Sequence, residues 1–140
     1  MQRPIKFRAW HRFIKIMFKH VCKLEFSNWN GEEHHLVSVF ARNHDDQARL
    51  DEAKNWELLQ FTGLKDKNGV EIYEGDIVLN HNEKLEVVFE KGGFNLKKKG
   101  SFQTPTGHWI SNSFHISSYS EKVMHVIGNI HEHPHLLEAK

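Results

Sequence analysis

The sequence predicts a mainly β protein of the β-rich α+β class. We expect a small, barrel-like or strongly bent antiparallel sheet with an N-terminal hairpin and one or two short helices. Near the N-terminus apolar residues alternate with charged ones, as in half-buried strands. Two turn signals lie close together, at Asn68-Gly69 and at Glu74-Gly75-Asp76. Further short apolar runs follow at turn-punctuated spacing, which is typical of small barrels.

The length and composition of the chain restrict the classes of protein to which it can belong. A chain of 140 residues predicts a single domain over residues 1–140 with enough buried surface for its own core. We find no run of about 18 apolar residues and no signal-peptide pattern, so we expect a cytoplasmic protein of a bacterial host cell with no membrane partner. The formal charge of +1, with 12 His counted as neutral, argues against a polyelectrolyte binder.

Residues 1–26 predict an N-terminal hairpin. The alternation over residues 5–9 gives its first strand, and a reversal is expected around His11 and Arg12. The even positions of the second strand are Ile14, Ile16, Phe18, His20, Cys22, Leu24 and Phe26. Because Cys22 is part of this pattern, we interpret it as a small buried side chain and not as a nucleophile.

The remaining chain divides into three predicted segments. Residues 27–58 form a variable segment whose best helix candidate spans 43–56, with Asn43 as N-cap. Residues 59–128 form the barrel-like core. Residues 129–140 form a tail in which Pro134 suits the first position of a short helical turn that docks Leu136 and Leu137.

The most informative stretch covers residues 59–79, LQFTGLKDKNGVEIYEGDIVL. Asn68-Gly69 favours a type I′ hairpin turn, which needs positive φ at both central residues. The Asp66 side chain is expected to bond its own backbone and reinforce the reversal. Glu74 and Asp76 flank Gly75, and we expect Asp76 to bond nearby amides and position the following strand instead of forming a catalytic carboxylate pair.

Three pieces of the chain resemble the YopX family, small proteins carried by bacteriophages and prophages. They are the stretch at 59–78, the opening IKFRAW at 5–10, and the close VIGNI at 126–130 followed by Pro134 and two leucines. The resemblance implies a phage or prophage accessory protein, and the family has no established activity to carry over. The signature positions are Gly63, Asn68, Gly69, Tyr73, Gly75, Asp76 and Gly128.

This chain departs from the family pattern in two places. The first turn usually carries Asp and other polar residues, whereas here it holds His11, Phe13 and Ile14, which predicts either an exposed apolar patch or different local packing. Where family members carry Tyr-Glu-Asn-Pro, this chain has His131-Glu132-His133-Pro134 followed by His135. Although His and carboxylate are zinc ligands, we interpret these His residues as local substitutions on a solvated tail and expect no metal or cofactor.

Nucleic-acid binding is the main alternative function. Lys97, Lys98 and Lys99 form a basic run, and Arg8 and Arg12 lie near the N-terminus. A basic face with aromatic platforms is how small barrels hold single strands, and Trp10, Phe13 and Trp109 are the candidate platforms. A lysine run beside a glycine turn is also typical of a solvated loop or a protected edge strand.

Enzymatic function is not predicted. The sequence has no nucleophile elbow, HExxH motif or phosphate-cradling glycine loop, and a metal-dependent hydrolase is only the second alternative. The leading hypothesis is binding of a protein partner or self-association as a homo-oligomer, because some of Trp10, Trp29, Trp56 and Trp109 are expected near the surface.

Overall fold

The computed structural model describes residues 4–27, 35–98, 102–103, 105–107, 109–110 and 113–138. The chain is mainly β, as the sequence predicts. The strands of its first half are β1 (Phe7–His11), β2 (Ile16–Phe18), β3 (His20–Phe26), β4 (Leu36–Arg42), β5 (Ala48–Glu52) and β6 (Trp56–Lys65). Those of its second half are β7 (Glu71–Tyr73), β8 (Asp76–Asn80), β9 (Glu83–Glu90), β10 (Gly93–Lys98), β11 (Phe102–Gln103), β12 (Trp109–Ile110), β13 (Ser113–His115) and β14 (His125–Asn129).

The helices of the described residues are single 3-10 turns, namely η1 (Ala53–Asn55), η2 (Ile116–Ser118) and η3 (Pro134–Leu137). The last begins with Pro134, as predicted. Within the ranges given above, no helix has the length and apolar character needed to cross a bilayer.

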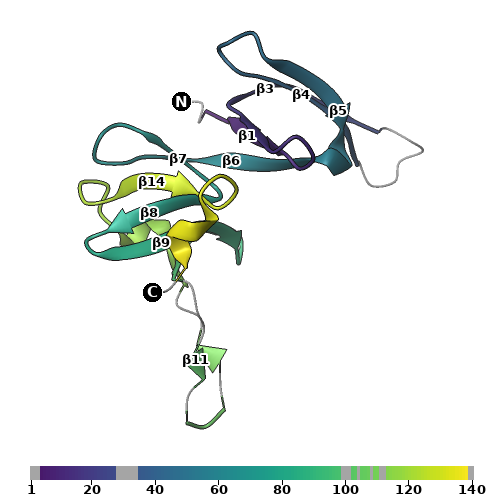
Figure 1. Ribbon diagram of the computed structural model, residues 1–140. Helices are drawn as coiled ribbons and strands as arrows, with labels where there is room; N and C mark the ends of the chain where they lie inside the picture. The colour runs from purple at the N-terminus through teal and green to yellow at the C-terminus, as the bar shows by residue number, and fades with distance from the viewer. Residues whose placement is uncertain are drawn as a thin grey trace. The chain divides into compact units, whose positions relative to one another are not determined.

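The chain contains two compact units, Met1–Phe61 and Thr62–Lys140 (Figure 1). Strand β6 runs from the first unit into the second, pairing with β1 in the former and neighbouring β7 in the latter. Each unit has its own cluster of buried apolar residues. The proposed organisation as one domain over residues 1–140 stays a prediction.

The first unit holds an antiparallel sheet of order β3-β4-β5, and β1 pairs with both β2 and β6. Its core consists of Ala9, Phe18, Val39, Ala41 and Trp56. The rings of Phe18 and Trp56 meet edge to face with centroids 5.2 Å apart, a favoured aromatic geometry. The small residues Ala9 and Ala41 leave room for these two large rings.

The N-terminal hairpin forms, but its second strand ends early. β1 and β2 pair with Ala9 opposite Phe18, whereas β3 pairs with β4. The predicted exposed patch at the first turn is present, since Phe13 is 74% and Ile14 39% exposed.

The interpretation of Cys22 as a buried side chain is wrong, because the thiol is exposed. The pairing of β3 with β4 shifts between Val21 and Lys23, so Cys22 is the extra residue of a β-bulge. A bulge interrupts the alternation of faces. Val21 and Leu24 pack against the core, while Cys22 and the neighbouring Lys23 are both exposed.

The helix expected over residues 43–56 is also wrong, apart from the single turn η1. Asn43 closes a reversal by donating its N–H to the Gln47 carbonyl at 2.7 Å, and Asp46 takes a positive φ of 63°. Strand β5 follows instead of a helix. The physical reason is that residues 48–52 alternate between exposed and half-buried positions, a period of two that a helix cannot satisfy.

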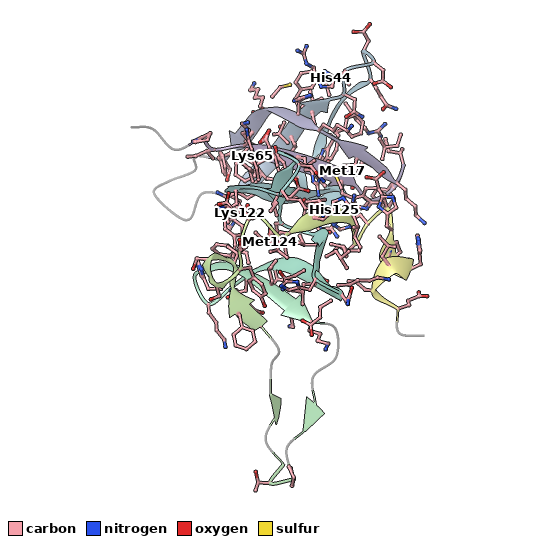
Figure 2. The ribbon with its side chains drawn as sticks, turned by 90° about the vertical axis from the view of Figure 1, so that its left-hand side faces the viewer. Met17, His44, Lys65, Lys122, Met124 and His125 are labelled. Atoms are coloured by element: carbon pink, nitrogen blue, oxygen red, sulfur yellow. The ribbon has the colours of Figure 1, made fainter. Side chains whose placement is uncertain are left out.

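The second unit is built on a strongly curled half-barrel sheet of order β13-β10-β9-β8-β14. Its core consists of Ile72, Val78, Leu85, Val87, Leu96, Ile116 and Met124. Met124 lies immediately before β14, between Lys122 and His125 in the chain (Figure 2). Every neighbouring pair in this sheet is antiparallel, which allows short connections and strong curvature.

The hairpin between β6 and β7 forms where Asn68-Gly69 predicts it, but its turn type is different. The Gly69 N–H donates to the Asp66 carbonyl at 3.0 Å, and the Asp66 N–H donates to the Val70 carbonyl at 2.8 Å. Gly69 has a φ of 80°, whereas Asn68 is not among the described residues with positive φ. The reversal is therefore a type I turn followed by a glycine bulge, and only Gly69 needs the left-handed conformation.

The C-terminal turn packs closely on β14. A Cβ atom at Gly128 would lie 2.8 Å from Nδ1 of His133 and 2.9 Å from Cδ1 of Leu136. Since real Cβ contacts are essentially never this short, only glycine allows η3 to approach the strand here. The predicted docking of the short helical turn is thus present, and Gly128 provides the space for it.

Candidate functional site

The surface with the most distinctive geometry is the solvent-facing side of the β3-β4-β5 sheet, here called the outer face. Opposite residues of an antiparallel pair point to the same side, and Phe40 lies opposite Leu50 while Arg42 lies opposite Ala48. Val39 and Ala41 between them are fully buried, so their neighbours must face solvent. The outer face consists of His20, Cys22, Lys23, Glu25, Ser38, Phe40, Arg42, Ala48, Leu50 and Glu52.

The centre of the outer face is apolar and its ends are polar. Phe40, Ala48 and Leu50 lie side by side, and Leu50 is 66% exposed. At one end the Ser38 hydroxyl donates to a Glu25 carboxylate oxygen at 3.3 Å. A contiguous apolar centre with a polar rim is typical of a protein interface.

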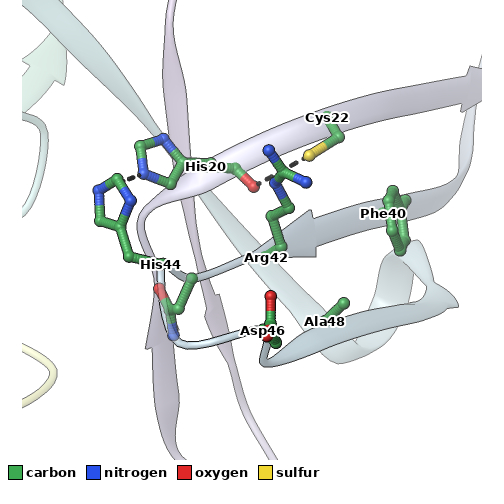
Figure 3. Close-up of a pocket in the computed structure, with 8 residues that line it drawn as sticks. His20, Cys22, Phe40, Arg42, His44, Asp46 and Ala48 are labelled. Carbon is green, nitrogen blue, oxygen red and sulfur yellow. Dashed lines mark hydrogen bonds between the residues drawn. The ribbon is translucent and has the colours of Figure 1, made fainter.

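The other end of the outer face is hollowed. A cavity of about 430 Å³ is lined by His20, Cys22, Phe40, Arg42, Asn43, His44, Asp46 and Ala48. In Figure 3, Arg42 rises from β4 on the same side of the sheet as His20 and Cys22, and the His44 ring faces the His20 ring. The Cys22 thiol contacts the His20 carbonyl with 3.7 Å between sulfur and oxygen.

The two imidazoles of this hollow touch. Their Nε2 atoms lie 2.9 Å apart, and both side chains are exposed. Residue 44 is held by its neighbour Asn43, whose Oδ1 accepts the Lys19 N–H at 2.8 Å and whose Nδ2 donates to the Met17 carbonyl at 3.1 Å. The reversal that carries His44 is therefore tied to the chain just before β3.

A buried polar network lies beneath the outer face. The His11 ring is fully buried, and its Nε2 lies 2.8 Å from Oδ2 of Asp51 on β5. The Asp51 carboxylate also accepts from Asn55 Nδ2 at 2.9 Å and from Arg49 Nε at 3.3 Å. The His11 bond first, and then those from Asn55, the Glu52 backbone and Arg49, hold the pKa of Asp51 well below its ordinary value.

Hydrogen-bond logic assigns the proton of His11. The Ile14 N–H donates to Nδ1 at 3.3 Å, so Nδ1 is an acceptor and the ring proton is on Nε2, facing Asp51. Arg49 Nε lies 3.0 Å from His11 Nε2 and 3.3 Å from Asp51 Oδ2. Because the protonated Nε2 has no free lone pair, the Arg49 N–H donates to the carboxylate. The bonds of Asp51 with His11, Asn55 and Arg49 hold the inward side of β5 in place. They thereby help to position Leu50, which points to the other side of the strand.

The predicted nucleic-acid residues are divided between the two units. In the first, Arg8 is half-buried on β1, and Arg12 pairs with Glu57 at 3.9 Å. In the second, Lys97 lies 3.8 Å from Glu90 and Lys98 lies 3.4 Å from Glu83. Lys99 lies outside the described residues, as does the Trp109 side chain.

A second hollow, of about 380 Å³, adjoins these lysines. Its lining residues are Glu86, Val88, Lys97, Lys98, Ile130, Pro134 and Leu137. The lysine stems thus cover apolar surface next to η3. The carboxylates near these lysines bring the local net charge close to zero. The electrostatic attraction of this surface for a nucleic acid is therefore weak.

The carboxylate of Asp76 is buried in the second unit, where it accepts the Tyr73 N–H at 2.8 Å, as the sequence predicts. Among the described residues, no group of three or more His, Cys, Asp or Glu side chains is arranged to hold a metal ion. In the C-terminal turn, the His133 Nδ1 accepts the Asn129 N–H at 3.3 Å, and its ring lies 6.3 Å from that of His135.

Asp66 joins the hairpin turn to β14. Its Oδ1 accepts the N–H groups of Asn68 and Val70 at 2.8 and 2.9 Å, and its Oδ2 accepts that of Val126 at 2.9 Å. Burial alone would raise the pKa of Asp66, but these three donors and the nearby His125 lower it. The predicted bond of Asp66 to its own turn is confirmed, and the link to β14 is an additional role.

Comparison with known proteins places this architecture in a family. The family model described as YopX protein matches residues 6–138, nearly the whole chain. The chain belongs to the YopX family. A similar fold is seen in the crystal structure of protein EF1440 from Enterococcus faecalis, with a TM-score of 0.63 and 28% sequence identity over 98% of this chain and 100% of that one. A search of curated proteins gives no match.

The YopX signature residues have structural roles in the second unit. Gly63, Gly69 and Gly75 all have φ between 80° and 90°, and Gly128 lies under the C-terminal turn. Asp76 and Tyr73 bond to each other across the second bend. The stretch by which the family is recognised therefore specifies the fold, while the outer face lies elsewhere in the chain.

Sequence reasoning missed the outer face. The signal was present in the alternation of Ala48, Leu50 and Glu52 with Arg49 and Asp51, which predicts a strand with one charged and one partly apolar side. Acidic residues after Asn43 favoured a helix instead. The bulge at Cys22 has no comparable signal, because the pattern of residues around it is an uninterrupted alternation.

Proposed function

We propose that this YopX protein is a phage or prophage accessory protein of the bacterial cytoplasm that acts by self-association through the outer face. The observation that carries the proposal is the exposed apolar centre formed by Phe40, Ala48 and Leu50 on a sheet whose opposite side is the core of the unit. Exposed apolar patches rimmed by polar residues mark interaction sites on soluble proteins.

A second copy of the chain fits this surface on electrostatic grounds. The formal charge of +1 produces little repulsion between copies. The hollow end of the outer face carries both Arg42 and Asp46, and Glu25 and Glu52 lie at the other end. In a two-fold arrangement that brings the hollow ends of two copies together, Arg42 of one copy can face Asp46 of the other.

The test is the mass in solution of the tag-free protein by size-exclusion chromatography with light scattering, under reducing conditions and over a range of concentrations. We expect the wild type to exceed the 16.5 kDa of one chain. Leu50→Lys introduces a charge at the centre of the outer face and is expected to restore the single-chain mass.

Phe114→Lys is the matched control, because Phe114 is 61% exposed on a strand of the second unit. This variant should assemble like the wild type. A wild-type mass of one chain at every concentration, or an assembly that survives Leu50→Lys in a folded variant, would contradict the proposal.

A further inference from the structure

The pair of imidazoles at the end of the outer face has the spacing of a chelate. Two nitrogens bound to one zinc ion at 2.0–2.1 Å with a tetrahedral angle lie about 3.3 Å apart. The Nε2 atoms of His20 and His44 lie 2.9 Å apart, with ring centroids at 4.4 Å and planes at 76°. Ligation requires both exposed rings to turn, so that the two Nε2 lone pairs converge on the ion instead of on each other.

We propose that His20 and His44 form a two-imidazole site for a divalent transition-metal ion of the zinc class. Imidazole nitrogen is a ligand that Zn²⁺, Ni²⁺ and Cu²⁺ share, whereas Mg²⁺ and Ca²⁺ prefer oxygen. The two Nε2 atoms point at each other across solvent-exposed space in the hollow (Figure 3). Without metal, one ring donates its single N–H to the other.

The backbone holds the two ligands in place before the metal arrives. His20 lies opposite Arg42 in the β3-β4 pairing. His44 follows Asn43, whose side chain bonds Met17, Lys19 and the Gln47 side chain at distances between 2.8 and 3.1 Å. Preorganisation of this kind lowers the entropy lost when a ligand binds.

Two imidazoles leave the coordination of the metal ion incomplete. We infer that a second copy of the chain supplies the other ligands, which rests on the proposed self-association. Zinc takes four ligands, and the described residues of one chain offer no group of three suitable side chains. A second copy whose hollow end meets this one would supply its own His20 and His44. Four imidazoles around one zinc would then connect two chains and make the assembly metal-dependent.

The charges that face the site are of both signs. Arg42 and Asp46 line the same hollow as the two imidazoles, and Asp45 lines the adjoining one together with His44 and Lys19. The carboxylates favour a cation and the guanidinium and ammonium groups oppose it, so the imidazoles decide the affinity.

The experiment is a calorimetric titration of tag-free, metal-stripped protein with zinc chloride at neutral pH. We expect the wild type to bind zinc, and His20→Ala with His44→Ala to lower the affinity by about tenfold or more. His35→Ala with His135→Ala is the matched control, since both side chains are exposed, and it should bind like the wild type. Magnesium chloride should give no heat of binding.

Stoichiometry separates this inference from the proposed self-association. One zinc per two chains, with a dimer that dissociates on chelation, supports both. One zinc per chain in a monomeric protein, lost in the His20 and His44 double variant, supports the metal site and contradicts the bridged assembly. Zinc binding that is unchanged in a folded double variant, or in a His20→Gln and His44→Gln pair of similar side-chain size, would overturn the metal site even if the protein still self-associates.

Discussion

The Nε2 atom of His11 lies 2.8 Å from Oδ2 of Asp51, a contact that joins residues 40 positions apart in the chain. It connects the end of β1 to the inward side of β5, directly behind the outer face. His11 is fully buried and also packs edge to face on Trp56, with ring centroids 4.7 Å apart. The polar contact therefore borders the apolar core of the first unit and helps to fix how β5 is placed.

Replacement of His11 should destabilise the protein strongly. We expect His11→Ala to lower the free energy of unfolding by about 2–5 kcal/mol, because large-to-small changes at fully buried positions leave a cavity and here also remove a hydrogen bond to Asp51. Urea unfolding followed by circular dichroism measures the change. His35→Ala, an exposed position before β4, should stay near wild type, and an equal loss in both variants would argue against the buried contact.

Stability should fall steeply in acid. The pKa of Asp51 and the pKa of Asp66 are both lowered in the folded state, so ionised carboxylates stabilise the fold. Their contribution is fully present above the unfolded pKa of about 3.9 and is lost as the pH falls through the lower folded values. Urea unfolding at pH 7 and at steps below about pH 4 measures this loss.

Asp66→Asn provides the matched test of that acid dependence. The amide keeps the shape of the side chain but places an NH₂ group opposite one of the donors Asn68, Val70 or Val126. We expect lower stability at pH 7 and a shallower decline below about pH 4. Asp45→Asn, at an exposed position, should keep the wild-type profile; a wild-type profile in Asp66→Asn would rule out this carboxylate as a source.

A methyl group at Gly128 should displace the C-terminal turn. Gly128→Ala would place Cβ 2.8 Å from Nδ1 of His133, so we expect a loss of about 1–3 kcal/mol in unfolding free energy, as for overpacked sites. Gly93→Ala is a graded comparison, since its nearest contact is His115 Nε2 at 3.1 Å. Adding His133→Ala to Gly128→Ala should recover part of the loss, and no recovery would show that crowding against His133 is not the cause.

The nucleic-acid alternative is tested at the lysines of β10. If Lys97 and Lys98 contact phosphates, changing both to Glu should abolish a mobility shift with single-stranded DNA at neutral pH. In a plot of the logarithm of the binding constant against the logarithm of the salt concentration, the wild type should then have a steeper slope than the double variant. The difference should be about one unit for each phosphate contact. Because both lysines already pair with glutamates, we expect little binding at physiological salt. A strong, salt-sensitive shift that disappears in the double variant would favour this function over self-association.

The sequence predicted the second unit better than the first, because its signals are local. Gly69 and Gly75 must adopt positive φ, and their neighbours Asp66 and Asp76 bond the adjacent backbone, so a short window contains the whole cause of each bend. Only the turn type was wrong, since Asn68 tolerates positive φ without requiring it. The strands on either side follow from β-branched and alternating residues.

The first unit depends on contacts that are distant in the chain. The strand at residues 48–52 is held by bonds from His11 and Arg49 to Asp51, and the contact with His11, 40 residues away, is not visible in any local pattern. Likewise the facing rings of His20 and His44 come from different segments, 24 residues apart. Of the family pieces, only the opening at residues 5–10 and the first residues of the stretch at 59–78 lie in this unit, and neither covers β3, β4 or β5.

The extra residue at Cys22 has a consequence for comparing this protein with its relatives. A relative one residue shorter between Val21 and Lys23 would lack this bulge, while the second shift between Glu25 and Phe26 would remain. In an alignment, the residues of β3 keep their true partners on β4 only if the gap is placed at Cys22. An alignment with the gap a few positions away would equate inward residues such as Leu24 with outward ones. Evolutionary profiles of this strand are therefore meaningful only when its irregular pairing is taken into account.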